Sequence, residues 1–285
     1  MITLDALARA SGTFLMVAMD QRESLRTMLA EHGHDPSDER MVRFKRAVAR
    51  ELAPHASGFL IDRHYGFEEV AALVPPSCGL ILAVDALVQT PGEAVEDTTL
   101  DTGADIEAAK AAGAVALKLL VIWRDDGRRP ERVELARAFV ELAAKRDLLS
   151  VLEPVVRVPD SDREAAIVEA ARELGAVRPS LYKCQVPLAG RGDREEITRH
   201  AREIDAVLPC PWVVLSQGVA AADFPRAVEA ACEGGASGML AGRAVWTTTL
   251  ADDDPTDLLR SESVPRLREL ARIVDAHGRP WREKT

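Results

Sequence analysis

The sequence predicts an α/β fold, a single (β/α)8 TIM barrel over residues 1–285. Eight short apolar, β-branched runs recur at intervals of roughly 30 residues, the length of a βαβ unit. The segments between them carry apolar residues at helical spacing. The runs themselves do not alternate apolar with polar residues, which is typical of parallel strands that are covered by helices.

The predicted strands follow one another in chain order as residues 14–20, 57–62, 79–85, 114–123, 148–156, 180–188, 211–218 and 237–243. Helices are predicted at 130–146, 162–176 and 264–278, the last closing the barrel, and 250–263 is the most loop-like segment. An open doubly wound sheet is the alternative, but no G-x-G-x-x-G motif follows the first strand. No composition shift divides the chain, so we expect one domain.

Composition excludes several classes of function. Hydrophobic residues make up 47% and charged residues 29%, and the net charge is −10 with no Lys/Arg-rich block, which argues against a nucleic-acid partner. No run approaches the ~20 apolar residues that cross a bilayer, and no signal sequence is evident, so we expect a cytoplasmic protein without membrane contact. The four cysteines lack a C-x-x-C pair and the histidines lack metal-ligand spacing, which predicts free thiols, no metal and no cofactor.

Polar residues stand at or near the end of each predicted strand. In a barrel of this kind the active site lies at the carboxyl ends of the strands. These polar residues are Asp20-Gln21-Arg22, Asp62-Arg63-His64, Asp85, Lys118, Arg124, Glu153, Arg157, Lys183, Gln185, Ser216-Gln217 and Arg243.

Period-2 alternation places three of these side chains inside the barrel. Lys118 shares a face with apolar neighbours two residues away, as does Glu153, and Lys183 points opposite to Tyr182 and Cys184. A lysine in a strand commonly extends its ammonium to water. Here several apolar residues follow each lysine, so we expect both to be buried, and buried charges must pair or lose their charge.

Such a cluster has a chemical use. A lysine attacks a carbonyl only as the neutral amine, which is scarce at neutral pH because the reference pKa is about 10.4. Desolvation and a neighbouring cation favour the neutral form, and Lys118 is the candidate cation. The resulting Schiff base withdraws electrons from a nearby carbon–carbon bond, and Glu153 is the candidate proton shuttle.

The last two strands predict a phosphate site. They end in LSQG and LAGRAVW, and the loops after strands seven and eight commonly bind phosphate in these barrels together with a helix N-terminus. Gly218 and Gly242 let the backbone approach an anion, and Arg243 offers a bidentate contact.

The segments AMDQRESLRTML, KLLVIWR, EPVVR, LYKCQVPL, WVVLSQGV and GASGMLAGRAVW resemble the class I aldolases of the tagatose-1,6-bisphosphate type, most closely the sulfofructosephosphate aldolase branch. The resemblance extends over nearly the whole chain. It implies catalytic roles for Asp20, Lys118, Glu153 and Lys183, with Lys183 as the Schiff-base lysine. The predicted substrate-binding residues are Gln21, Arg22, Arg63, His64, Ser216, Gly218, Gly242 and Arg243.

The chain departs from that family in two positions, Gln185 in place of an acidic residue and Gln217 in place of a serine. Arg63 and His64 are candidates for a second anion site. The resemblance implies cleavage of 6-deoxy-6-sulfofructose 1-phosphate to dihydroxyacetone phosphate and 3-sulfolactaldehyde. Tagatose 1,6-bisphosphate, a deoxy-sugar-acid phosphate, or non-catalytic binding of a sugar phosphate are the alternatives. We expect a homo-oligomer.

Overall fold

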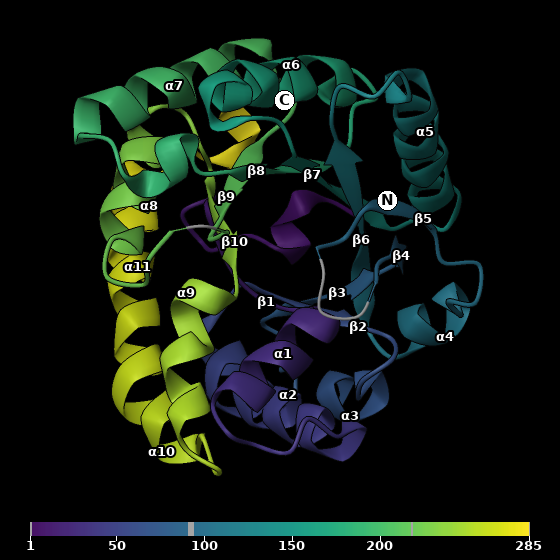
Figure 1. Ribbon diagram of the computed structural model, residues 1–285, viewed down its shortest axis with the longest axis vertical. Helices are drawn as coiled ribbons and strands as arrows, with labels where there is room; N and C mark the ends of the chain where they lie inside the picture. Colours follow the sequence, from purple (N-terminus) through teal and green to yellow (C-terminus); the bar gives the residue numbers. More distant parts are fainter. Residues whose placement is uncertain (1, 91–93, 218, 285) are drawn as a thin grey trace.

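The strands form a closed, all-parallel, eight-stranded barrel (Figure 1) in the order β1-β10-β9-β8-β7-β6-β3-β2. This is a computed structural model, and it describes residues 2–90, 94–217 and 219–284. The barrel strands are β1 (Phe14–Met19), β2 (Gly58–Asp62), β3 (Gly79–Ala83), β6 (Ala114–Trp123), β7 (Leu149–Val156), β8 (Leu181–Gln185), β9 (Trp212–Leu215) and β10 (Gly238–Ala241). The predicted (β/α)8 barrel is confirmed, with every strand inside its predicted range.

Helices surround the strands (Figure 1). They are α1 (Glu23–Glu31), α2 (Asp38–Leu52), α3 (Phe67–Ala71), α4 (Ile106–Ala111), α5 (Arg129–Lys145), α6 (Arg163–Gly175), α7 (Arg194–Val207), α8 (Phe224–Glu233), α9 (Arg243–Trp246), α10 (Thr256–Leu258) and α11 (Val264–His277). The predicted helices 130–146, 162–176 and 264–278 are confirmed as α5, α6 and α11.

The expected loop at 250–263 is wrong in its second half. A π-helical turn, Leu259–Ser263, joins α10 directly to α11. Asp254 precedes this helical stretch, and its Oδ1 accepts hydrogen bonds from Thr256 N at 3.0 Å and Thr256 Oγ1 at 2.6 Å. These contacts form a turn ahead of α10, whose N-cap position is Pro255.

Side chains alternate between the inside and the outside of the barrel as predicted. Val151 and Leu181 belong to the apolar cluster inside the barrel, whereas Tyr182 and Cys184 pack in the cluster between strands and helices. This alternation carries the side chains of Lys118 and Lys183 to the inner face, where both residues are almost completely buried.

The N-terminal segment fills the bottom of the barrel. Leu4 and Leu7 pack against Phe14 and Met16 in the inner cluster, and the short helical turn Leu4–Ala6 is the purple segment among the strands in Figure 1. Apolar side chains thus occupy this end of the barrel, and the polar side chains gather at the other end.

An antiparallel hairpin, absent from the sequence-based prediction, interrupts the βα alternation after β3. Its strands are β4 (Asp85–Val88) and β5 (Asp97–Leu100). Thr98 Oγ1 donates to the carbonyl oxygen of Leu120 at 2.7 Å and so fastens the hairpin to β6. Four-residue strands without a tight turn between them leave little periodic signal.

The structure also describes the four cysteines and the length and polarity of the helices. The four cysteines are buried and unpaired, as predicted, and burial raises the pKa of each thiol. Among the described residues, no helix combines the length and the apolar character that a bilayer span requires.

Candidate active site

A cavity of about 280 Å³ opens at the carboxyl ends of the barrel strands. Its wall is formed by the segment that follows β1, the β4–β5 hairpin, β6, β7, β8 and the start of α9. The predicted site residues that line it are Asp20, Gln21, Arg22, Lys118, Glu153, Lys183 and Arg243.

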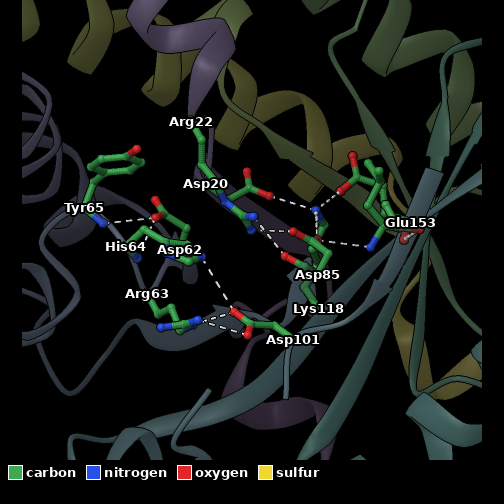
Figure 2. A network of polar contacts seen from close by, with 12 residues as sticks. Asp20, Arg22, Asp62, Arg63, His64, Tyr65, Asp85, Asp101, Lys118 and Glu153 are labelled. Carbon is green, nitrogen blue, oxygen red and sulfur yellow. Dashed lines mark hydrogen bonds and ion pairs between the residues drawn. The ribbon is translucent and has the colours of Figure 1, made fainter. Parts of the chain in front are cut away.

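Lys118 lies at the centre of three carboxylates (Figure 2). Its Nζ is 2.8 Å from Asp20 Oδ2, 2.9 Å from Asp85 Oδ2 and 2.9 Å from Glu153 Oε2. Burial by itself lowers the pKa of Lys118, but the three carboxylates raise that pKa by more, so it lies well above its ordinary value. The Lys118 side chain is therefore a fixed cation in the cavity floor.

Glu153 connects the two lysines. Its Oε2 is 2.9 Å from Lys183 Nζ and also 2.9 Å from Lys118 Nζ. The side chains of the lysines are only 3–4% exposed. This oxygen forms an ion pair with each lysine but makes no hydrogen bond within the described residues, and it lies close enough to exchange a proton with Lys183.

Asp20 remains ionised in this cluster. Burial raises the pKa of Asp20, but Lys118 and Lys183 together lower it by more, so the net pKa lies well below its ordinary range. The carboxylate thus stays available as a hydrogen-bond acceptor at neutral pH.

Asp85 is a site residue that the sequence analysis did not select. Its Oδ1 accepts a hydrogen bond from Arg22 Nη2 at 2.5 Å, and its Oδ2 accepts one from Leu120 N at 3.2 Å in addition to the Lys118 contact. The signal was present, because Asp85 ends an apolar run just as Asp20 does. Arg22 lines the cavity but is held by Asp85 and by the Asp85 carbonyl oxygen at 2.9 Å.

The side chain of Arg243 lies in the cavity wall. It makes no hydrogen bond or ion pair through its side chain with any part of the chain that the structure describes. Burial lowers the pKa of Arg243, against an opposite effect of Glu153 and Asp20. An unpaired, partly buried guanidinium attracts an anion.

The other predicted substrate-binding residues of the last two strands are Ser216, Gly218 and Gly242. A side chain at Gly242 would place its Cβ 2.4 Å from the Ala18 carbonyl oxygen, so this position requires glycine. Ser216 is buried, and its Oγ accepts a hydrogen bond from Ala244 N at 3.4 Å. Gly218 lies outside the described residues.

The structure does not bring Arg63 and His64 to the other site residues. Neither lines the cavity, and the Arg63 guanidinium forms an ion pair with Asp101, including an Nη2–Oδ1 hydrogen bond of 3.0 Å (Figure 2). The backbone N–H of His64 donates to Asp62, which is fully buried against Lys45. Asp101 follows β5, so the hairpin supplies the partner that occupies Arg63.

Among the residues that the structure describes, one group of possible metal ligands lies away from this cavity. Glu229, Glu233 and His277 come together on α8 and α11. Arg194 contacts both carboxylates, at 3.0 Å in the case of Glu229, so a cation of the chain already occupies one side of this group. The expected independence from metal stays a prediction.

The chain is similar to known aldolases. A family model described as "DeoC/LacD family aldolase" matches residues 14–248. Tagatose 1,6-diphosphate aldolase 2 of Streptococcus pyogenes serotype M3 is 28% identical, with 96% of this chain and 94% of the relative covered. Tagatose 1,6-diphosphate aldolase of Listeria monocytogenes serotype 4a is 27% identical, with 98% and 92% covered.

Solved structures share the fold. Fructose-bisphosphate aldolase from Plasmodium falciparum superposes with a TM-score of 0.75 at 13% identity, over 96% of this chain and 93% of that one. An archaeal fructose 1,6-bisphosphate aldolase gives a TM-score of 0.64 at 21% identity, over 96% and 98%.

Proposed function

This chain belongs to the DeoC/LacD family of aldolases and is a lyase that cleaves carbon–carbon bonds, and on that premise we propose that it is a class I aldolase with its imine on Lys183. The observation that carries the proposal is the position of Glu153. Its Oε2 lies 2.9 Å from Lys183 Nζ, at the wall of the cavity that Arg243 also lines. A nucleophilic lysine needs a base that removes its proton and an apolar environment that favours the neutral amine.

The proposed reaction begins when neutral Lys183 Nζ attacks the C2 carbonyl of the ketose. Proton transfers through Glu153 allow the carbinolamine to lose water and form a protonated imine. A carboxylate then takes the proton of the C4 hydroxyl, the C4 oxygen becomes the aldehyde carbonyl, and the electrons of the C3–C4 bond move into the imine. Protonation of the enamine at C3 and hydrolysis release the ketone product and restore Lys183.

Lys118 and Arg243 support this chemistry by their charge. Lys118 is held protonated by Asp20, Asp85 and Glu153, so it donates hydrogen bonds to substrate oxygens and does not compete as the nucleophile. Arg243 binds the phosphate on C1, with Ser216 and the backbone at Gly242 beside it.

For the substrate we propose 6-deoxy-6-sulfofructose 1-phosphate, which would yield dihydroxyacetone phosphate and 3-sulfolactaldehyde. The support is the resemblance of the motifs around Asp20, Lys118 and Arg243 to that branch of the aldolases. The second candidate is tagatose 1,6-bisphosphate, which the two tagatose 1,6-diphosphate aldolase relatives favour. Both are ketohexose 1-phosphates with an anion on C6.

Borohydride trapping tests the imine. Reduction in the presence of dihydroxyacetone phosphate should add the mass of the reduced adduct to the peptide that contains Lys183, as measured by peptide mass mapping. Lys183→Met should abolish both the adduct and turnover. We expect this variant to remain folded, because Glu153 keeps its contact with Lys118.

Lys118→Met is the matched comparison, since it removes the other buried lysine. It should still form the adduct on Lys183, although more slowly. An adduct on Lys118, or no adduct on either lysine in the wild type, would contradict the proposal.

A further inference from the structure

We propose that Arg157 binds the second anionic group of the substrate, the phosphate or sulfonate that a ketohexose 1-phosphate carries on C6. This inference rests on the proposed function, in which Arg243 holds the C1 phosphate and Lys183 the C2 carbonyl. It names the residue by which the enzyme selects substrates with two anionic ends.

Arg157 is a cation at the cavity wall, and none of the described residues supplies its counter-charge. It follows β7 directly, and its backbone N–H donates to Trp123 O at 2.7 Å, which fixes the position of its Cα. Its side chain lines the cavity, and its buried Nε has no hydrogen-bond partner in the part of the chain that the structure describes. No hydrogen bond or ion pair joins the guanidinium to any other described residue.

The electrostatic surroundings favour an anion at this position. Burial lowers the pKa of Arg157, and the neighbouring guanidinium of Arg124 lowers it further. Arg124 is itself paired with Asp126 at 2.8 Å. A bound phosphate or sulfonate would relieve both effects by supplying the missing negative charge and hydrogen-bond acceptors.

The other cations at the mouth of the barrel are already engaged. Arg22 is bound by Asp85, Arg63 by Asp101, and the two lysines by the carboxylates of the cavity floor. Among the described residues that line the cavity, Arg157 and Arg243 are therefore the two cations without an ionic partner. This distribution assigns the second anion to Arg157 rather than to Arg63.

The positions of the two arginines suit a ligand that crosses the cavity. Arg243 follows β10 and Arg157 follows β7, and β9 and β8 lie between these strands in the barrel order. Lys183, on β8, points into the same cavity from the intervening wall. A ketose with one anion on each arginine would thus present its middle carbons to the nucleophile.

The test uses the aldol condensation, in which the two halves of the substrate are added separately. Dihydroxyacetone phosphate is combined with glyceraldehyde 3-phosphate, 3-sulfolactaldehyde or uncharged glyceraldehyde. Arg157→Gln should raise KM for the preferred anionic aldehyde at least about 10-fold, the loss expected for a charge-assisted hydrogen bond. The KM values for glyceraldehyde and for dihydroxyacetone phosphate should stay within about twofold.

Further variants sharpen this comparison. Arg157→Lys should recover part of the affinity, because it keeps the charge and loses the planar fork. Arg124→Gln, which removes a nearby arginine outside the cavity lining, should show no selective effect. Arg63→Gln tests the alternative, in which Arg63 binds the second anion. The aldehyde for which the wild type has the higher kcat/KM, glyceraldehyde 3-phosphate or 3-sulfolactaldehyde, shows whether that anion is a phosphate or a sulfonate.

Two results would overturn the assignment. One is an equal rise in KM for charged and uncharged aldehydes in Arg157→Gln, and the other is the selective loss in Arg63→Gln instead. Borohydride trapping with dihydroxyacetone phosphate keeps the two proposals apart. Absence of the Lys183 adduct in the wild type would refute the imine, whereas a normal adduct without a selective Arg157 effect would refute only this anion site.

Discussion

Lys118 shows how a charged residue can be stable inside the barrel. Moving an ammonium group out of water costs several kcal/mol, which a single partner seldom offsets. Three carboxylates at 2.8–2.9 Å surround this ammonium, and two of them have a further partner, Asp85 in Arg22 and Glu153 in Lys183. Asp20 has no other ion pair among the described residues, so its charge depends on Lys118 most directly.

Replacing Lys118 by methionine should therefore destabilise the fold by about 3–5 kcal/mol at neutral pH, because buried carboxylates lose their counter-charge. In the wild type the pKa of Asp20 is lowered, so its contribution to stability is present above the unfolded pKa of about 3.9 and declines below it. In the variant the uncompensated carboxylate should have a raised pKa, so the variant gains stability as the pH falls through that value. Urea unfolding should therefore show that the difference in the free energy of unfolding between the wild type and Lys118→Met becomes smaller as the pH is lowered from 8 to 5.

Two further variants control for this effect. Lys145→Met removes a lysine whose side chain is 74% exposed and should change stability by less than about 0.5 kcal/mol. Adding Asp20→Asn to Lys118→Met should restore part of the lost stability, because the uncompensated charge is then absent. A stability difference that does not depend on pH would contradict the electrostatic explanation.

At the scale of elements, the β4–β5 hairpin is the insertion that shapes the site. Its first residue is Asp85, which holds both Arg22 and Lys118. Leu87 of the same strand lines the cavity. The residue after β5 is Asp101, which forms an ion pair with Arg63. The hairpin and the residue after it thus supply the carboxylates that pair with Lys118 in the cavity floor and with Arg63 outside the cavity.

The contact of the hairpin with β6 should be measurable through a matched pair of threonines. Thr98→Val removes the hydrogen bond to Leu120 O and leaves that carbonyl unsatisfied, which should cost about 1–3 kcal/mol. Thr99→Val is the control, since Thr99 is exposed on the opposite face of the same strand. Thr98→Val should show faster hydrogen exchange in β5 and a lower free energy of unfolding in urea than Thr99→Val. Equal effects of the two variants would show that the Thr98–Leu120 hydrogen bond does not stabilise the hairpin.

For the whole molecule, the features that could be predicted from the sequence are those that local periodicity determines, namely the order of the strands and the side chains that face the inside of the barrel. The strand pattern and period-2 alternation were enough to place Lys118, Glu153 and Lys183 inside one barrel. They could not predict the partner of Arg63, because Asp101 is 38 residues away and reaches it only through the hairpin. The free side chain of Arg157 was equally inaccessible, since whether an arginine is paired depends on all the strands that meet at the mouth.

The whole molecule should also work and fold without a metal ion. Three carboxylates that converge on one point resemble the oxygen ligands that hard divalent cations prefer, but here the Lys118 ammonium occupies that point. The positive charge that a metal would supply is therefore built into β6, and an imine on Lys183 would provide the electron sink. We expect exhaustive EDTA treatment followed by dialysis to leave both kcat and Tm unchanged, as measured by condensation rate and by thermal unfolding. Loss of activity that Zn²⁺ restores would mean that the cluster around Lys118 does not replace a metal and that the reaction follows a different aldolase mechanism.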